Sequence, residues 1–156
     1  MTPEELMRRA ITVALRGIDA GQSPFGCAIA RDGQIIACHH NVVLATTDIT
    51  AHAEITALRA ACRETNRVLL DDCIAASTCE PCPMCMAALH WARVTTVYYG
   101  ATIHDAAAAG FNELQLPAEQ LLRTGGSRVR LVPGVLRDEC RALFTIWQQH
   151  PDHQTY

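Results

Sequence analysis

Apolar residues at the start of the chain recur at intervals of three or four positions. This repeat predicts an amphipathic helix over residues 2–20, with Thr2 as its cap and Gly21 as its end. Two short apolar stretches follow, at 25–30 and 35–40, on either side of an Asp-Gly pair. Such a pair is a strong hairpin signal, because both residues tolerate the backbone angles of a tight turn. The chain is therefore expected to begin with a helix and a β-hairpin.

Strands and helices alternate through the rest of the chain. The expected elements, in order, are a helix at 52–66, a strand at 73–77, a helix at 83–93, a strand at 95–100, a short helix at 105–109, a strand at 129–132 and a helix at 135–148. Alternation of this kind implies parallel strands joined by crossover helices. We therefore predict an α/β fold, a three-layer α/β/α sandwich with a mixed five-stranded sheet.

The composition is that of one ordinary domain spanning residues 1–156. Apolar residues make up 49% of the chain and charged residues 19%, and no apolar run approaches the roughly 18 residues of a membrane span. The acidic N-terminus lacks the basic and apolar pattern of a secretory signal. We expect a cytoplasmic protein without a membrane partner.

The net charge is −3, carried by a chain with thirteen arginines and no lysine. Proteins that hold nucleic acid by its phosphates need a concentrated cationic surface. The one loose basic cluster consists of Arg123, Arg128, Arg130, Arg137 and Arg141. We expect an ordinary solvated face there and no nucleic-acid partner, with a phosphate-binding surface as the alternative.

Eight cysteines are spread along the chain, and two of them, Cys82 and Cys85, have the spacing of zinc ligands. This spacing favours a reducing compartment over a framework of disulfides. Five others have apolar neighbours and are expected to be small core residues: Cys27, Cys38, Cys62, Cys73 and Cys140.

A metal site is predicted from His52, Cys82 and Cys85. One imidazole and two thiolates are three protein ligands for a tetrahedral Zn²⁺, and they leave a fourth position for water, as in catalytic sites. A His-x-Glu followed downstream by Pro-Cys-x-x-Cys is also the signature of zinc-dependent nucleobase deaminases. The alternative is a closed structural site in which Cys79 is the fourth ligand.

Both halves of this site are expected at helix N-termini. Pro83 suits a first turn, where a missing N–H costs little, and the positive end of the helix dipole favours thiolate over thiol. Thr50 is the expected N-cap of the helix near His52. Positions i and i+2 lie about 200° apart around a helix, so His52 and Glu54 can converge only if the histidine is in the opening turn.

Glu54 is the predicted proton shuttle of the site. Zinc lowers the pKa of its water from about 15.7 to about 7. A carboxylate within reach can take the proton and deliver it to a leaving nitrogen. The alternative is a surface glutamate that is merely favoured by the helix dipole.

Further segments accompany these motifs along the chain. In order they are Ser23–Gly26, Asn41, Thr50–Glu54, Cys79–Cys85, Trp91–Arg93 and Asp105–Phe111. With them the chain resembles the cytidine deaminase-like superfamily over nearly its whole length, and within it the bacterial guanine deaminases. The segment that ends at Phe111 is the part that separates guanine deaminases from tRNA adenosine deaminases.

The resemblance implies substrate contacts outside the metal motif. It implies that Asn41 hydrogen-bonds the edge of a purine and that Phe25 and Trp91 form apolar walls. It also places Ala53 among the substrate-binding positions. A flat heteroaromatic ring needs apolar faces and a few polar groups at its edge, which agrees with these residue types. The alternatives are core packing for the two aromatic residues and a turn role for Asn41.

A second catalytic carboxylate is also implied by the resemblance. In the family an acidic residue just after the Gly-Phe pair assists the leaving amino group. Here Phe111 is followed by Asn112 and Glu113, so the role is assigned to Glu113. The alternative is a solvated loop glutamate.

The chain ends in a polar tail, residues 149–156, whose last residue is Tyr156. In the resembling family the C-terminal segment is exchanged between subunits and closes over the active site of the partner. The resemblance therefore implies a homodimer in which Tyr156 caps the purine pocket. The alternative is a disordered terminus.

The predicted function is the hydrolytic deamination of guanine to xanthine and ammonia. Zn²⁺ is the expected cofactor and a free purine base the expected small-molecule partner. A free base needs no phosphate-binding surface, which suits the negative net charge. Two alternatives stay open: a tRNA adenosine or cytosine deaminase, and a zinc-stabilised binding module without turnover.

Overall fold

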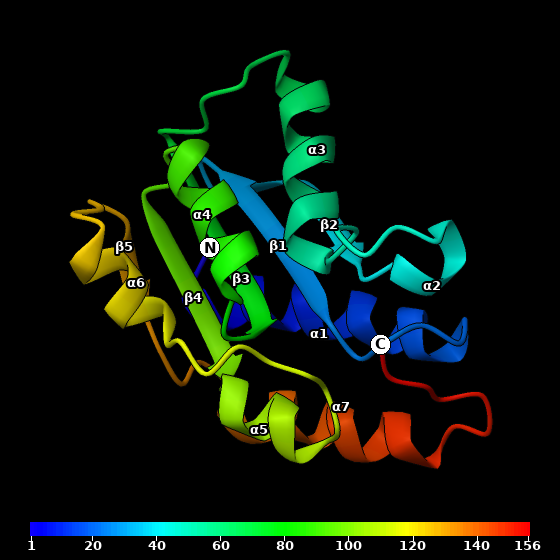
Figure 1. The fold of residues 1–156 in the computed structure, drawn as a ribbon. Coiled ribbons are helices and arrows are strands. Elements are labelled where there is room, and N and C mark those ends of the chain that lie inside the picture. The colour runs from blue at the N-terminus through cyan, green and yellow to red at the C-terminus, as the bar shows by residue number, and fades with distance from the viewer.

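A mixed β-sheet lies between two layers of helices in the computed structural model, which describes all residues 1–156 (Figure 1). Its strands are β1 (Gly26–Arg31), β2 (Gln34–His40), β3 (Cys73–Cys79), β4 (Thr96–Ala101) and β5 (Arg130–Val132). The strand order is β2-β1-β3-β4-β5; β1 is antiparallel to β2 and β3, whereas β3, β4 and β5 are parallel. The predicted mixed five-stranded sheet is confirmed.

The N-terminal helix and hairpin form as the sequence predicts. Helix α1 (Pro3–Asp19) begins with a capping box, in which the side chains of Thr2 and Glu5 each accept a hydrogen bond from the other residue's backbone N–H. The turn between β1 and β2 is made by Asp32 and Gly33, with φ of 50° and 77°. Both residues therefore have the left-handed backbone that a tight hairpin turn requires.

Six further helices complete the fold. They are α2 (Val43–Thr46), α3 (Ala53–Thr65), α4 (Pro83–Trp91), α5 (Ile103–Ala108), α6 (Ala118–Thr124) and α7 (Arg137–Gln149). The sequence prediction missed α2 and α6. Helix α2 has only four residues, too few for a periodic apolar pattern, and neither helix begins with a residue whose side chain caps it.

Two apolar clusters pack on opposite faces of the sheet. One joins α3, α4 and α6 to the sheet, and the other joins α1, α5 and α7 to it. Side chains of β1 alternate between them: Ile29 belongs to the first cluster, whereas Ala28 and Ala30 belong to the second. This alternation confirms the predicted three-layer arrangement. None of the helices combines the length and apolar character needed to cross a membrane.

Two members of the basic cluster pair with one acidic side chain. Arg141 Nε lies 3.1 Å and Arg137 Nη2 3.9 Å from the carboxylate of Asp105, which is itself part of the capping box that starts α5. Both arginines are more than half exposed, so these ion pairs contribute little to stability. They join the start of α5 to α7.

Candidate active site

Two candidate metal ligands stand at the N-termini of helices on the same face of the sheet. His52 is the N-cap of α3 and Cys82 is the N-cap of α4, and both have extended backbone. Neither side chain caps its own helix, so both are free to point elsewhere. The expectation that Thr50 caps α3 was wrong, because its hydroxyl donates a hydrogen bond to Asp48 (2.6 Å) and the N-cap of the helix is His52, two residues later.

The spacing of three ligand atoms fits one tetrahedral ion. His52 Nδ1 lies 3.7 Å from Cys82 Sγ and 3.5 Å from Cys85 Sγ. Ligand atoms about 2.0 and 2.3 Å from one zinc are roughly 3.5 Å apart when the bonds are tetrahedral. Cys79 does not belong to this group, and its thiol instead donates to the carbonyl oxygen of Thr102 (3.4 Å). The chain therefore presents a three-ligand arrangement rather than the closed alternative.

The electrostatics of this cluster favour a thiolate at Cys82. Hydrogen bonding from Cys85 lowers the pKa of the Cys82 thiol to about 4; burial opposes this shift and His52 adds to it. The same hydrogen bond, together with burial, raises the pKa of Cys85. One sulfur is thus ready to bind a cation, and a bound cation would deprotonate the other.

Glu54 lies beside this cluster, in the first turn of α3, and is only 6% exposed. Ser77 Oγ, at the end of β3, donates a 2.7 Å hydrogen bond to its Oε1. Burial, and then the charge of Cys82, raise the pKa of Glu54, whereas His52 and the Ser77 hydroxyl lower it; the net shift is upward. A carboxylate held in one position with a raised pKa is suited to take up and release a proton.

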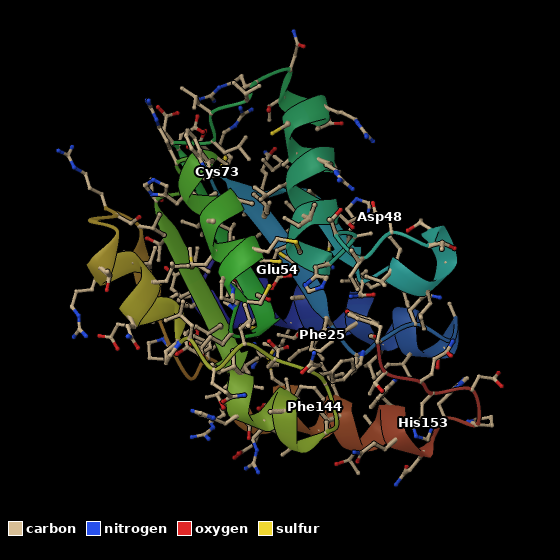
Figure 2. The ribbon with its side chains drawn as sticks, viewed as in Figure 1. Phe25, Asp48, Glu54, Cys73, Phe144 and His153 are labelled. Atoms are coloured by element: carbon tan, nitrogen blue, oxygen red, sulfur yellow. The ribbon has the colours of Figure 1, made fainter.

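Two of the three candidate metal ligands, His52 and Cys82, line a cavity of about 310 Å³ together with Glu54. Figure 2 shows Glu54 near the centre of the molecule, with Phe25 close to it. The residues that line the cavity are Phe25, Ile49, His52, Glu54, Cys79, Glu80, Cys82, Pro83, Met84, Phe111, Asn112, Glu113, Leu114 and Tyr156. The lining is mostly apolar and aromatic, with carboxylates at a few positions, which is the pattern of a site for a small ring compound.

Aromatic rings form one side of the cavity. The ring centroid of Phe111 lies 4.8 Å from that of Phe25 and 5.8 Å from that of Tyr156, in edge-to-face arrangements. Phe111 also lies 5.0 Å from Trp147, which is buried. Phe25 therefore lines the cavity, and Phe111 connects it to the C-terminal helix.

The C-terminal tail turns back from α7 toward the cavity of its own chain (Figure 1). Tyr156 lines the cavity, and its hydroxyl accepts a 2.6 Å hydrogen bond from Asn41 Nδ2. Asn41 is fully buried, and its Oδ1 accepts from the backbone N–H of Val43 (3.0 Å). The amide of Asn41 thus contacts the tail and its own backbone in this structure, and it does not line the cavity.

Glu113 lines the cavity from the loop between α5 and α6. Burial, and then the charge of Cys82, raise the pKa of its carboxyl to about 7. The neighbouring Asn112 also faces the cavity. Two carboxylates with raised pKa values, Glu54 and Glu113, therefore share one apolar cavity.

Comparison with known proteins agrees with this geometry. Residues 1–101 match the family model of the cytidine and deoxycytidylate deaminase zinc-binding region. The chain belongs to this family. The guanine deaminase of Bacillus subtilis (strain 168) is 47% identical to this deaminase over 127 residues, which are 77% of this chain and 81% of that protein. The tRNA-specific adenosine deaminase of Aquifex aeolicus (strain VF5) is 37% identical over 119 residues, 75% and 79% of the two chains.

Solved structures resemble the deaminase over almost its whole length. The guanine deaminase from Nitrosomonas europaea is 28% identical, with a TM-score of 0.86 over 94% of this chain and 84% of that chain. A structure in complex with 2,6-diaminopurine is 29% identical, with a TM-score of 0.87 over 94% and 81% of the chains. The resemblance to a deaminase family predicted from the motifs is confirmed.

Two predicted substrate contacts lie away from the cavity of the deaminase. Trp91 is 79% exposed and stands at the last residue of α4. The nine residues of this helix span about 13 Å, so Trp91 lies at the opposite end from Cys82 and does not line the cavity. The expectation that it forms an apolar wall was wrong for this chain's cavity. Ala53 is fully buried in the core cluster under α3 and is not a lining residue either.

Two polar residues of the deaminase site were missed in the sequence. Ser77 and Glu80 are 2% and 7% exposed. A signal for both was present, because Ser77 is one of two polar residues in a mostly apolar strand and Glu80 directly follows the end of that strand. Buried polar groups need partners, so each was a candidate for a specific contact.

Proposed function

We propose that this chain is a zinc-dependent guanine deaminase, which converts guanine and water to xanthine and ammonia. The observation that carries the proposal is the buried carboxylate of Glu54 beside three side chains with the geometry of zinc ligands, His52, Cys82 and Cys85, in an apolar cavity. The relatives named as guanine deaminases support guanine as the substrate.

The side chains divide the reaction between them. When bound, the zinc supplies Lewis-acid activation of water at neutral pH. Glu54 accepts a proton from the attacking water and delivers it to the amino nitrogen of the substrate. A C–O bond forms at the carbon that carries the exocyclic amine and the C–N bond breaks, which leaves xanthine and ammonia. Glu113, in the loop between α5 and α6, has a pKa raised to about 7 and assists the departing nitrogen.

Binding uses the aromatic rings and the amide of Asn41. Phe25 and Phe111 offer apolar surface to a flat purine ring. Asn41 recognises the purine edge, and its Nδ2 carries two hydrogens, so it can donate to the substrate as well as to the hydroxyl of Tyr156. The tail opens to admit guanine and closes over it, which excludes water during the reaction.

A homodimer is part of the proposal. The sequence resemblance implies a tail that is exchanged between subunits, whereas in this structure of one chain the tail covers the chain's own cavity. The same contacts with Asn41 would form if residues 149–156 came from a partner subunit, because exchange of an identical element preserves its contacts.

Ammonia release from a panel of compounds tests the substrate. We expect turnover of guanine to exceed that of adenine, cytosine and a tRNA anticodon stem–loop under matched conditions. Polar groups of the cavity that hydrogen-bond the edge of guanine would lack partners when a different base is bound. Faster turnover of the tRNA would support the second candidate, a tRNA adenosine deaminase, which the Aquifex aeolicus relative makes the main rival. Release from none of them by metal-loaded protein would favour a non-catalytic module.

A further inference from the structure

Glu80 is a buried carboxylate that the reaction above does not use. It lies between the end of β3 and Cys82, and it is 7% exposed. Its backbone N–H donates to the carbonyl oxygen of Ala101 (2.8 Å), which continues the pairing of β3 with β4. The backbone of Glu80 is thus fixed to the sheet next to a metal-binding cysteine.

The carboxylate of Glu80 accepts two backbone hydrogen bonds from distant helices. Oε2 accepts from the N–H of Ile103 (3.2 Å) and Oε1 from the N–H of Ala118 (2.8 Å). These residues are the first of α5 and α6. A buried charge persists only where such donors replace water, and a helix N-terminus is a favourable place for a negative charge. Because Pro117 offers no capping side chain, Glu80 supplies that contact for α6.

The two helix starts that Glu80 holds enclose the loop that carries the second catalytic carboxylate. Between the end of α5 and the start of α6 the chain has no regular structure, yet Phe111, Asn112 and Glu113 all line the cavity. The buried ring of Phe111 holds the beginning of this loop. Beyond it the N–H of Glu113 bonds only to the carbonyl oxygen of Phe111 (2.9 Å), a local contact. The position of Glu113 therefore depends on Phe111 on one side and on what holds the start of α6 on the other.

We propose that Glu80 is a positioning residue that holds Glu113 in the cavity by bonding to the residues that begin α5 and α6. Glu80 borders the cavity, but both of its carboxylate oxygens accept bonds from backbone N–H groups and it is not one of the three candidate metal ligands, so we assign it no catalytic step. Its effect on turnover rests on the proposed function, whereas its effect on the loop does not. Displacement of a catalytic group by about 1 Å lowers the rate on the order of 10²-fold. Loss of the side chain that fixes this loop should therefore lower kcat measurably.

Hydrogen exchange tests the anchoring without any assay of activity. In Glu80→Gln the amide NH₂ cannot accept a hydrogen bond, so one of the two backbone N–H groups loses its partner. We expect backbone amides in residues 103–118 to exchange at least about tenfold faster, with bound metal and the exchange of α3 unchanged. Glu119→Gln is the matched control, because Glu119 is an exposed carboxylate in the first turn of α6. Unchanged exchange in Glu80→Gln would overturn the proposal.

A double-mutant cycle tests whether the effect on turnover passes through Glu113. We expect Glu80→Gln to lower kcat by about 10- to 100-fold with a smaller change in KM, but to have less than about a threefold effect when introduced into Glu113→Gln. Equal losses in both backgrounds would show a merely structural role and overturn the proposal. If Glu80→Gln does not fold, Glu80→Asp replaces it, since the shorter carboxylate reaches one helix start but not both.

The two measurements separate this inference from the proposed function. A wild-type protein that releases no ammonia from guanine would refute the proposed function, and hydrogen exchange would still decide whether Glu80 anchors the loop. A wild-type protein that deaminates guanine, with a Glu80→Gln variant unchanged in both exchange and kcat, would refute the positioning role alone.

Discussion

Removal of the Ser77 hydroxyl isolates the contact that holds the proposed proton shuttle. In Ser77→Ala one oxygen of Glu54 loses a 2.7 Å charge-assisted hydrogen bond at a position where the carboxylate is only 6% exposed. Water has little access to replace the donor. The hydroxyl bonds to the ionised form and lowers the pKa of Glu54, so its removal raises that pKa further.

The size of the effect follows from the strength of such a bond. A hydrogen bond to a charged group contributes about 1.5–3 kcal/mol, and one pKa unit corresponds to about 1.36 kcal/mol. If Glu54 must be ionised to accept a proton from water, the acidic limb of the pH profile of kcat/KM for guanine should move up by about 1–2 pH units in Ser77→Ala. At pH values above the shifted limb the rate should return toward that of the wild type.

The control is the adjacent residue. Thr78→Val also removes a hydroxyl that is buried, in this case one that accepts from the backbone N–H of Gly26 (3.0 Å), and it does not touch Glu54. Both variants should lower the melting temperature, but only Ser77→Ala should move the acidic limb. Two results would refute the assignment of Ser77 as the partner that sets the ionisation of Glu54. One is an acidic limb at the same pH in Ser77→Ala and the wild type, and the other is an equal shift of that limb in Ser77→Ala and Thr78→Val.

Four further outcomes are expected. Cys82→Ala should lose the bound zinc and the activity together while Cys79→Ala keeps about one zinc per chain by elemental analysis, and loss of zinc from Cys79→Ala would support a four-ligand site. Glu54→Gln should keep zinc and fold but lose about 10²–10⁴-fold or more in kcat, so more than a tenth of wild-type turnover would contradict its role. In metal-free protein the carboxyl of Glu113 has its pKa raised from 4.5 to about 7, so the folded state binds that proton more tightly; its contribution to stability is present below about pH 4.5 and is lost as the pH rises through about 7. Melting temperatures of metal-free wild type should therefore fall across this window more than those of Glu113→Gln, and parallel curves would contradict the raised pKa. Deletion of residues 150–156 should keep zinc and fold but severely lower activity on guanine, and unchanged kinetics would show that the tail does not close the cavity.

The metal cluster could be predicted because its residue types and spacing form a known signature, although His52 and Cys82 are 30 positions apart. Cys82 and Cys85 are related by the repeat of one helix, and His52 precedes another. The contacts between such segments also follow from the fold, since parallel strands place the loops at their carboxyl ends along one edge of a sheet. The same helix explains why Trp91 does not line the cavity. Cys82 stands at the N-terminus of α4, beside the cavity, whereas Trp91 is nine positions further along and about 13 Å away, at the other end of the helix.

Other contacts between residues far apart in sequence could not be predicted. Asn41 bonds to Tyr156 across 115 positions, and the resemblance placed both residues near the purine without indicating this hydrogen bond. Helix α6 was missed because its first turn has no capping residue of its own, and the contact that replaces one comes from Glu80, 38 positions earlier. Local propensity is a weak guide where a tertiary contact satisfies the end of the helix.

The two carboxylates proposed for proton transfer are held by the same physical means. Glu54 bonds to Ser77 at the end of β3, and the loop of Glu113 is held by Glu80, three residues further along. Ser77 therefore lies within β3 and Glu80 directly follows it, and each bonds to a segment from a different part of the chain. β3 is the central strand of the five, paired with β1 on one side and β4 on the other, so it is a rigid element from which to position them. A site that needs two groups with raised pKa values in one cavity gains from this arrangement, since the relative position of the groups depends on a single rigid element rather than on the loops that carry them.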